Sequence, residues 1–329
     1  RWTYKFEEAA RQGAAAALIV HDTPGASYGW DVVRNSWSGA QFDLPPANDP
    51  EPRLPLQGWI TGEVARTLFA DAGLDLDAMY RAAGTRGFKP VPLKARASTT
   101  LRSTTRAGSS RNVVAMLPGA TRPREAVVYM AHWDHLGDHG HAGETAPDGD
   151  VIYNGAVDNA TGVAGILEIA QAFARGPRPA RSVVFMAVTL EESGLLGSKF
   201  YVANPAIALR DTVGVINIDA MSVAGPSRDV VVFGRGSSEL EDLLEPIVVA
   251  QGRVLVDEPT PQDGLYFRSD HFNFAKAGVP ALYTRGGEDL IDGGPAAGAA
   301  VARAYRSERY HKPGDEFDPA WPLSGVMQD

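Results

Sequence analysis

The sequence contains no cysteine, which excludes disulfide bridges, cysteine-ligated zinc sites and thiol nucleophiles. Any bound metal must therefore be held by histidine and carboxylate side chains. The chain also lacks an apolar run of the roughly 18 residues that a membrane-spanning helix needs, and no basic cluster stands out. With 31 Lys and Arg against 40 Asp and Glu, the formal net charge is −9. We therefore expect no membrane span and no nucleic-acid partner.

The length of 329 residues is sufficient for about two domains or one large one. A content of 44% hydrophobic and 22% charged residues is ordinary for a globular protein with a buried core. The chain opens with Arg1-Trp2-Thr3 rather than with methionine and a signal sequence. We expect it to be a processed or truncated piece of a longer protein, and the sequence sets no oligomeric state.

The first part of the chain carries a mixed pattern of helix and strand. We expect helices at about 4–12 and 62–83, a buried strand at 14–20, and a long surface loop between residues 22 and 55, where Pro, Gly, Asn and Ser are frequent. Residues 93–105 alternate between apolar and polar side chains, which predicts an extended strand. We place the domain boundary near Pro92.

The second part of the chain alternates short apolar runs with amphipathic helices. A stripe of apolar residues predicts a helix over 161–174. The apolar runs are at 113–117, 126–130, 183–188, 213–218 and 281–283. Runs that are apolar on both faces are typical of strands covered on both sides. The pattern predicts an α/β sandwich with a mixed sheet.

Candidate metal ligands follow three of these predicted strands. The run at 126–130 leads to His132 and Asp134, the run at 183–188 leads to Glu191 and Glu192, and the run at 213–218 leads to Asp219. Two further candidates are Asp158, just before the predicted helix, and His311 near the end of the chain. In open α/β sheets ligands bind at the carboxyl ends of strands, so we expect these side chains to converge.

This set of side chains suits a pair of divalent cations. Two ions about 3.5 to 4 Å apart need one bridging ligand and two further ligands each, which five residues provide. The adjacent pair Glu191 and Glu192 is informative because neighbouring side chains point in different directions. One carboxylate can then bind metal while the other serves as general base and acid.

Each residue taken alone also has an ordinary structural interpretation. His132 fits a histidine at a strand end, Glu191 and Glu192 fit the acidic start of a helix, and Asp158 fits a helix N-cap. Their joint placement at consecutive strand ends favours a metal site.

The motifs resemble, in order and spacing, peptidase family M28, the co-catalytic zinc aminopeptidases and glutamate-carboxypeptidase-like enzymes. The resemblance covers about residues 110–320. Its motifs are His132-x-Asp134, Asp158-Asn159-x-Thr161-Gly162, Glu191-Glu192, Asn217-x-Asp219 and Tyr310-His311. The resemblance implies a three-layer α/β/α zinc exopeptidase fold over residues 93–329. It also implies that residues 1–92 are part of a protease-associated domain.

The same resemblance implies roles for single residues. Asp158 would bridge two zinc ions, with His132 and Asp219 completing one site and Glu192 and His311 the other. Glu191 matches the general base.

Further residues are implied around this centre. Asp134 matches the carboxylate that orients the His132 imidazole, and Tyr310 matches a tyrosine that donates to the oxyanion, although it also fits an aromatic packed at the sheet edge. The Asp158-Asn159 peptide is expected to be cis. Asp270, His271 and Phe274 lie in a stretch resembling the segment that lines the substrate pocket, with Asp270 and His271 expected beside the ligands rather than among them.

The remaining histidines are expected to lie outside the site. His135, His139 and His141 belong to a loop rich in Gly and Asp, which predicts a solvent-exposed rim.

We expect an aminopeptidase that hydrolyses a terminal peptide bond of a peptide or aminoacyl substrate. A carboxypeptidase remains open because Arg235, Arg268 and Arg285 follow strand-like runs and could bind a substrate carboxylate. The sequence also leaves open a non-catalytic binding module on the same fold, a hydrolase of non-peptide amides, and a cyclase that needs one metal. The resemblance and the negative charge suggest a periplasmic or extracellular location.

Overall fold

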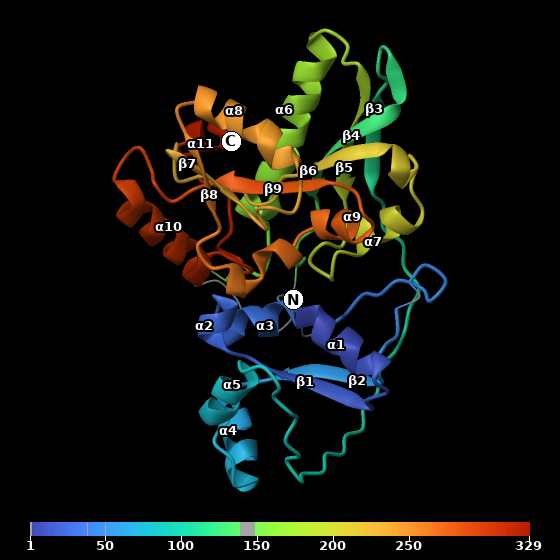
Figure 1. The fold of residues 1–329 in the computed structure, drawn as a ribbon, viewed down its shortest axis with the longest axis vertical. Helices are drawn as coiled ribbons and strands as arrows, with labels where there is room; N and C mark the ends of the chain where they lie inside the picture. The colour runs from blue at the N-terminus through green and yellow to red at the C-terminus, as the bar shows by residue number, and fades with distance from the viewer. Residues whose placement is uncertain (1, 38, 50, 139–148) are drawn as a thin grey trace. The chain divides into compact units, whose positions relative to one another are not determined.

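The computed structural model describes residues 2–37, 39–49, 51–138 and 149–329. The chain divides into two compact units (Figure 1). The first unit comprises Arg1–Trp30 and Glu51–Ser109, and the second comprises Asp31–Pro50 and Ser110–Asp329. The chain therefore leaves the first unit at residue 31 and returns to it at residue 51.

The first unit is built on a short two-stranded parallel sheet. Strand β1 (Ala16–Val20) pairs with β2 (Leu56–Ile60) in register from Ala16–Leu56 to Val20–Ile60. Phe6 and Ile19 are buried in this unit. The helices assigned to it are α1 (Trp2–Arg11), α2 (Thr23–Ala26), α4 (Gly62–Asp71) and α5 (Leu76–Ala83). Thr61 and Asp75 cap α4 and α5 by accepting the N–H groups of Val64 and Ala78.

The second unit contains a seven-stranded mixed sheet with the strand order β3-β5-β4-β6-β9-β7-β8. The four central strands, β5, β4, β6 and β9, run parallel to one another. The pairs β3–β5 and β7–β9 are antiparallel. The strands are β3 (Val113–Leu117), β4 (Arg122–His132), β5 (Arg181–Val188), β6 (Thr212–Asn217), β7 (Asp229–Val232), β8 (Val254–Asp257) and β9 (Ala281–Gly286).

Helices cover both faces of this sheet, which gives the three layers expected from the sequence. Because side chains alternate along a strand, Val128 and Tyr129 of β4 face opposite sides. Val128 belongs to the main core with Phe274 of α9 (His271–Lys276). On the other face, the ring centroid of Tyr129 lies 6.0 Å from that of Phe173 in α6 (Thr161–Arg175). The other helices of the unit are α3 (Trp30–Trp37), α7 (Leu196–Ala203), α8 (Leu240–Ala250), α10 (Gly294–Glu308) and α11 (Ser324–Gln328).

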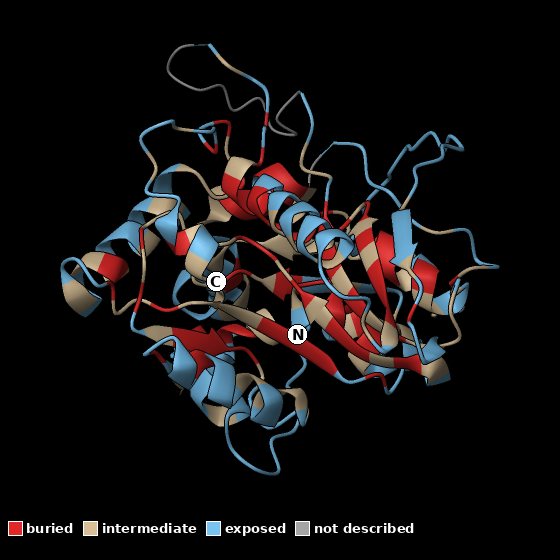
Figure 2. Cartoon of the chain, turned by 90° about the horizontal axis from the view of Figure 1, so that it is seen from above, coloured by how far each residue is buried: buried red, intermediate tan, exposed pale blue. Residues whose placement is uncertain are grey.

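The core lies along the central parallel strands, where buried residues concentrate (Figure 2). Val128, Met130, Val184, Met186 and Val215 have no exposed surface. Central strands that are packed on both faces in this way fix the positions of the residues that follow them.

Several expectations for local structure are wrong. Residues 93–105 form no strand: Lys94 has a φ of 55°, which interrupts an extended chain, and within the described part of the chain the segment joins neither sheet. The region 22–55 is not only a loop, since it contains α2 and α3. Strand β3 is at the sheet edge with Val113 61% exposed, so its apolar run is not covered on both faces.

The sheet also contains two strands that the sequence patterns did not indicate. β7 and β8 have four residues each and lie beyond β9 at the far edge of the sheet. Helix α6 and the strands β4, β5, β6 and β9 occur where the apolar patterns predicted them.

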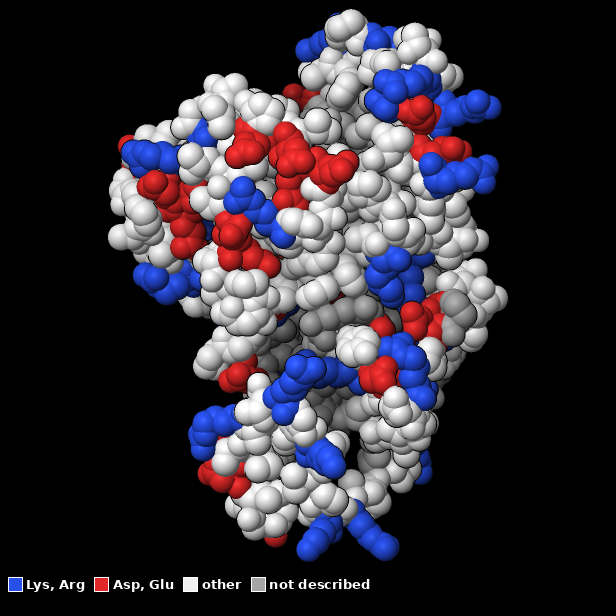
Figure 3. Space-filling view, viewed as in Figure 1, with Lys and Arg blue, Asp and Glu red and all other residues white. Residues whose placement is uncertain are grey.

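Charged groups of both signs are interspersed on the face drawn in Figure 3, as the modest net charge leads one to expect. Within the described parts of the chain, no helix combines the length and the apolar character needed to cross a lipid bilayer.

Candidate metal centre

The candidate site lies at the carboxyl ends of β4, β5 and β6. His132 is the last residue of β4 and pairs in register with Val188, the last residue of β5. Asp219 follows β6, and Glu191 follows β5. Since these three strands are parallel and adjacent, their carboxyl ends meet at one edge of the sheet, and the loops bring their side chains together.

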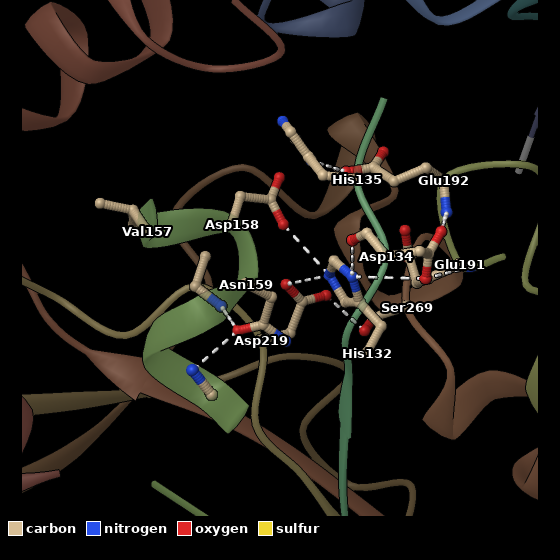
Figure 4. Close-up of polar contacts among 12 residues, drawn as sticks. His132, Asp134, His135, Val157, Asp158, Asn159, Glu191, Glu192, Asp219 and Ser269 are labelled. Carbon is tan, nitrogen blue, oxygen red and sulfur yellow. Dashed lines mark hydrogen bonds and ion pairs between the residues drawn. The ribbon is translucent and has the colours of Figure 1, made fainter. Parts of the chain in front are cut away.

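The imidazole of His132 occupies the centre of the first group of ligands (Figure 4). Its Nε2 atom lies 3.1 Å from Oδ1 of Asp158 and 3.5 Å from Oδ1 of Asp219. The side chain is only 1% exposed, yet Nε2 makes no hydrogen bond to any described residue. A buried nitrogen without a hydrogen bond, facing two carboxylates, is the arrangement that a shared cation would satisfy.

A second group forms around Glu192. Nε2 of His311 lies 3.0 Å from Oε2 of Glu192 and 3.5 Å from Oδ2 of Asp158. Asp158 therefore directs one carboxylate oxygen toward His132 and the other toward His311. The structure thus brings together all five residues that the sequence analysis named as ligands.

The charges in this cluster strongly perturb one another. Burial alone would raise the pKa of Glu192, but the imidazoles of His311 and His135 lower it to about 2. Burial would lower the pKa of His311, but Glu192 and Asp158 raise it to about 10. Burial raises the pKa of Glu191 well above its usual range, and the neighbouring carboxylates of Glu192 and Asp219 add to this effect. Carboxylates held this close together favour a positive charge among them.

The residues fit a metal ion by their chemistry as well as by their positions. Imidazole nitrogen and carboxylate oxygen are the donors that zinc takes when no thiolate is present. Among the described residues, three sets place one donor atom from each member within 4.8 Å of the others. These sets are His132, Asp158 and Asp219; His132, Glu191 and Glu192; and His135, Asp158 and Glu192.

His135 belongs to this cluster, contrary to the expectation of an exposed rim. Its side chain is 5% exposed, and Nδ1 lies 2.6 Å from Oε1 of Glu192. The position of His135 directly after the His132-x-Asp134 motif could have indicated that it belongs to the site. The Gly-rich sequence that follows it instead favoured an exposed loop. His139 and His141 lie outside the described residues.

Asp134 acts on the site through two contacts. Its main-chain carbonyl lies 3.1 Å from Nδ1 of His132, so Nδ1–H donates to the backbone while the carboxylate oxygen Oδ1 is 3.9 Å away. The Asp134 carboxylate instead accepts the main-chain N–H groups of Glu191 at 3.0 Å and Glu192 at 3.4 Å. The imidazole is therefore oriented by the backbone of Asp134, and the carboxylate holds the loop after β5.

The segment around Asp158 is fixed by two polar side chains. The carboxylate of Asp315, which has no exposed surface, accepts the N–H groups of Val157 at 3.1 Å and Asp158 at 3.0 Å. The amide of Asn159 accepts from Gly162 and Ala220 and donates to the carbonyl of Ile218. These bonds join the start of α6 to the loop after β6. The Asp158-Asn159 peptide is cis, as expected.

Ser269 is a further functional candidate that sequence reasoning did not single out. Its hydroxyl donates to Oδ2 of Asp219 at 2.5 Å and accepts from Nδ2 of Asn217 at 2.7 Å. The serine thus fixes the carboxylate whose other oxygen faces His132. Metal ligands are commonly held in this way by neighbouring hydrogen bonds.

The expected pocket residues are fully buried. Asp270, His271 and Phe274 have no exposed surface. Phe274 belongs to the main core, and the hydroxyl of Ser198 donates to Oδ1 of Asp270 at 2.5 Å. Side chains with no exposed surface do not line a pocket that is open to solvent, so these three residues do not form the expected pocket wall.

Tyr310 lies beside the candidate ligands. Its ring contacts the imidazole of His311 in a tilted arrangement, with 4.0 Å between the ring centroids and 33° between the ring planes. Tyr310 is partly buried, whereas His311 is buried. The tyrosine ring is therefore in direct contact with a candidate ligand.

Three known proteins are similar to this chain over part of their length. A leupeptin-inactivating enzyme of Streptomyces exfoliatus is 30% identical over 220 residues, which cover 64% of this chain and 45% of that protein. A probable lipoprotein aminopeptidase of Mycobacterium tuberculosis is 28% identical over 236 residues, which cover 67% of this chain and 41% of that protein. The solved structure of an aminopeptidase from Aneurinibacillus aligns with a TM-score of 0.47 at 20% identity. The alignment covers 95% of this chain and 68% of that one.

The chain spans less than half the length of these two curated relatives. The sequence profile of peptidase family M28 matches residues 112–329, which is more than half of the chain and includes all five candidate ligands. The chain is therefore a member of peptidase family M28.

Proposed function

We propose that this protein is a metal-dependent exopeptidase, and specifically an aminopeptidase that uses two zinc ions and Glu191 as its general base. The observation that carries the proposal is the position of Asp158 between two histidines, with Oδ1 at 3.1 Å from His132 and Oδ2 at 3.5 Å from His311. One carboxylate with an oxygen toward each imidazole suits a ligand shared by two ions.

The five residues divide into two sets around this shared carboxylate. His132 and Asp219 would complete the first zinc site, and Glu192 and His311 the second. Bound there, two zinc ions would supply the positive charge that lowers the pKa of a water molecule and polarises a substrate carbonyl.

Glu191 is the side chain best placed to move the proton. It is buried beside the ligands and comes from the same loop as Glu192, which the Asp134 carboxylate holds. In the proposed reaction the Glu191 carboxylate accepts a proton from the attacking water and then donates it to the leaving amine. Tyr310, whose ring lies against His311, is proposed to donate a hydrogen bond to the oxyanion.

An aminopeptidase is favoured over a carboxypeptidase by the partners of the three arginines. A carboxypeptidase needs a cation for the substrate carboxylate, whereas an aminopeptidase needs carboxylates for the substrate ammonium group. Arg235 pairs with Asp257 at 3.0 Å. Arg268 donates to the carbonyl of Asp263, and Arg285 donates to the carbonyl of Asp219 and to the hydroxyl of Tyr283. The relative from Mycobacterium tuberculosis is itself named as a probable aminopeptidase.

The test combines metal analysis with substrate turnover. Protein purified without chelator is expected to contain about two zinc ions per chain and to hydrolyse leucyl p-nitroanilide, and chelation should abolish hydrolysis until zinc is restored. An N-blocked dipeptide serves as the carboxypeptidase substrate. One zinc per chain would support a cyclase, while no zinc binding would support a non-catalytic binding module and contradict the proposal.

A further inference from the structure

The segment Asp31–Pro50 is part of the second unit, although the residues on both sides of it belong to the first. An ion pair anchors each end of it: Asp31 lies 2.7 Å from Lys312, and Asp49 lies 2.7 Å from Lys199. The segment also lies outside the residues 112–329 that match the family profile. We call it the anchored segment.

The anchored segment contacts both the side chain and the backbone of His311. Oγ of Ser36 lies 2.7 Å from Nδ1 of His311, and Nδ2 of Asn35 donates to the main-chain carbonyl of His311 at 3.2 Å. Asn35 is fully buried, and Ser36 and His311 are each 8% exposed. His311 also has a φ of 55°, a left-handed conformation that non-glycine residues keep only where their surroundings hold it.

The contact at Nδ1 bears on how His311 can bind a metal through its other nitrogen. Nε2 faces Glu192 and Asp158, so it must offer a lone pair to act as a ligand. The proton of the neutral imidazole must then be on Nδ1, where the Ser36 hydroxyl can accept it. The Ser36 hydroxyl can accept the Nδ1 proton at 2.7 Å, so this contact stabilises the tautomer that a ligand needs.

The two candidate histidine ligands are held in different ways. Nδ1 of His132 donates to the main-chain carbonyl of Asp134, which every residue type at that position supplies. Nδ1 of His311 depends on a side-chain hydroxyl that a single substitution removes. A difference of this kind allows one metal site to be weakened without touching any ligand.

We propose that Ser36 is a positioning residue for the metal ligand His311, so that the anchored segment completes the second zinc site from outside the family-matched region. This inference rests on the role of His311 in the proposed function. Loss of such an outer hydrogen-bond partner typically weakens metal binding about 10–100-fold.

The experiment titrates zinc into the chelator-stripped full chain in competition with a chromogenic chelator. Ser36→Ala should leave one zinc equivalent at wild-type affinity and weaken the other about 10–100-fold. Ser36→Thr keeps the hydroxyl and should restore the second affinity. Ser182→Ala is the matched control, because Ser182, like Ser36, is a buried serine with hydrogen bonds. It bonds to Pro123 and Gly119 and lies at the start of β5 rather than at its carboxyl end.

The possible results separate this inference from the proposed function. Two zinc equivalents with unchanged affinities in Ser36→Ala overturn the inference alone, as does an equal loss in Ser182→Ala, which would show a general packing effect. No zinc binding by the wild-type chain overturns both. If the alanine variant does not fold, Ser36→Cys replaces it with the same expectations, since a thiol is a weaker hydrogen-bond acceptor of similar shape.

Discussion

The carboxylate of Asp134 accepts the main-chain N–H of Glu191 at 3.0 Å. Asp134 follows β4 and Glu191 follows β5, so this bond fixes one ligand-bearing loop against the next. The same carboxylate accepts the N–H of Glu192 at 3.4 Å. The proposed general base and a proposed metal ligand thus share one anchor.

Replacing Glu191 with glutamine should remove turnover while leaving the metals bound. The amide has nearly the same shape but cannot accept the proton of the attacking water, and general acid–base catalysis contributes about 10²–10⁴-fold. We expect kcat for leucyl p-nitroanilide to fall by about that factor. Zinc content by elemental analysis should stay at the wild-type value, and a wild-type rate under metal-replete conditions would assign the base to another residue.

Replacing Asp134 with alanine should disturb both glutamates together. The change leaves two main-chain N–H groups without their acceptor, although the backbone contact to His132 remains. We expect kcat to fall and zinc affinity to weaken, each by about 10–100-fold. Steady-state kinetics and zinc competition measure the two effects, and a loss of kcat with wild-type zinc affinity would limit the role of Asp134 to Glu191.

Replacing Asp315 with alanine should destabilise the fold even without metal. The buried carboxylate accepts the N–H groups of Val157 and Asp158, and an unsatisfied buried group costs about 1–3 kcal/mol. We expect the free energy of unfolding in urea with chelator present to fall by about 2–4 kcal/mol. Asp315→Asn keeps one acceptor oxygen and should lose less; equal losses would show that hydrogen bonding is not the cause.

Replacing Gly162 with alanine should also be destabilising, whereas the same change at Gly165 in the same helix should be much milder. A Cβ atom at Gly162 would meet Oδ1 of Asn159 and lie 2.6 Å from the main-chain oxygen of Ile218. At Gly165 the nearest atom is the sulfur of the flexible Met221 side chain, at 3.2 Å. Thermal unfolding of the two variants tests this order, and equal melting temperatures would contradict it.

The pH dependence of stability should reveal the buried carboxyl of Asp270. Burial raises its pKa to about 7, and the charges of Asp134 and Asp219 act in the same direction, whereas the unfolded value is 3.8. Between these two values the unfolded chain has lost the proton and the folded protein has kept it. The contribution of Asp270 to stability is therefore largest below pH 3.8 and is lost as the pH rises toward 7.

Asp270→Asn carries no titrating proton, so its urea stability should fall less steeply between about pH 4 and 7. The measurement uses chelator-treated protein, because bound cations would change the charge balance. The measured quantity is the slope of the free energy of unfolding against pH, since the amide also changes the absolute free energy of unfolding. The exposed Asp71→Asn exchange controls for the general loss of one negative charge; identical slopes in wild type and Asp270→Asn would contradict the prediction.

The four central strands of the sheet could be predicted because they are apolar on both faces, as Val128 and Tyr129 show. The alternation at 93–105 misled because it has no partner strand in the described part of the chain and Lys94 interrupts it with a left-handed φ. The ligands could be named because they follow strands whose parallel order brings them together. The contact of Ser36 with His311 could not be predicted, because Ser36 lies 275 residues before His311 and belongs to no motif.

The positions of the ligands along the chain have a consequence for biosynthesis. The first candidate, His132, leaves the ribosome long before the last, His311, and the two meet only after the strands between them have paired. Of the two proposed zinc sites, the second needs His311 and so cannot be complete in the nascent chain until synthesis has passed that residue, whereas His132, Asp158 and Asp219 of the first all precede it. All strands of the seven-stranded sheet precede His311 in the chain, so the proposed second metal would bind only after the whole sheet has been synthesised.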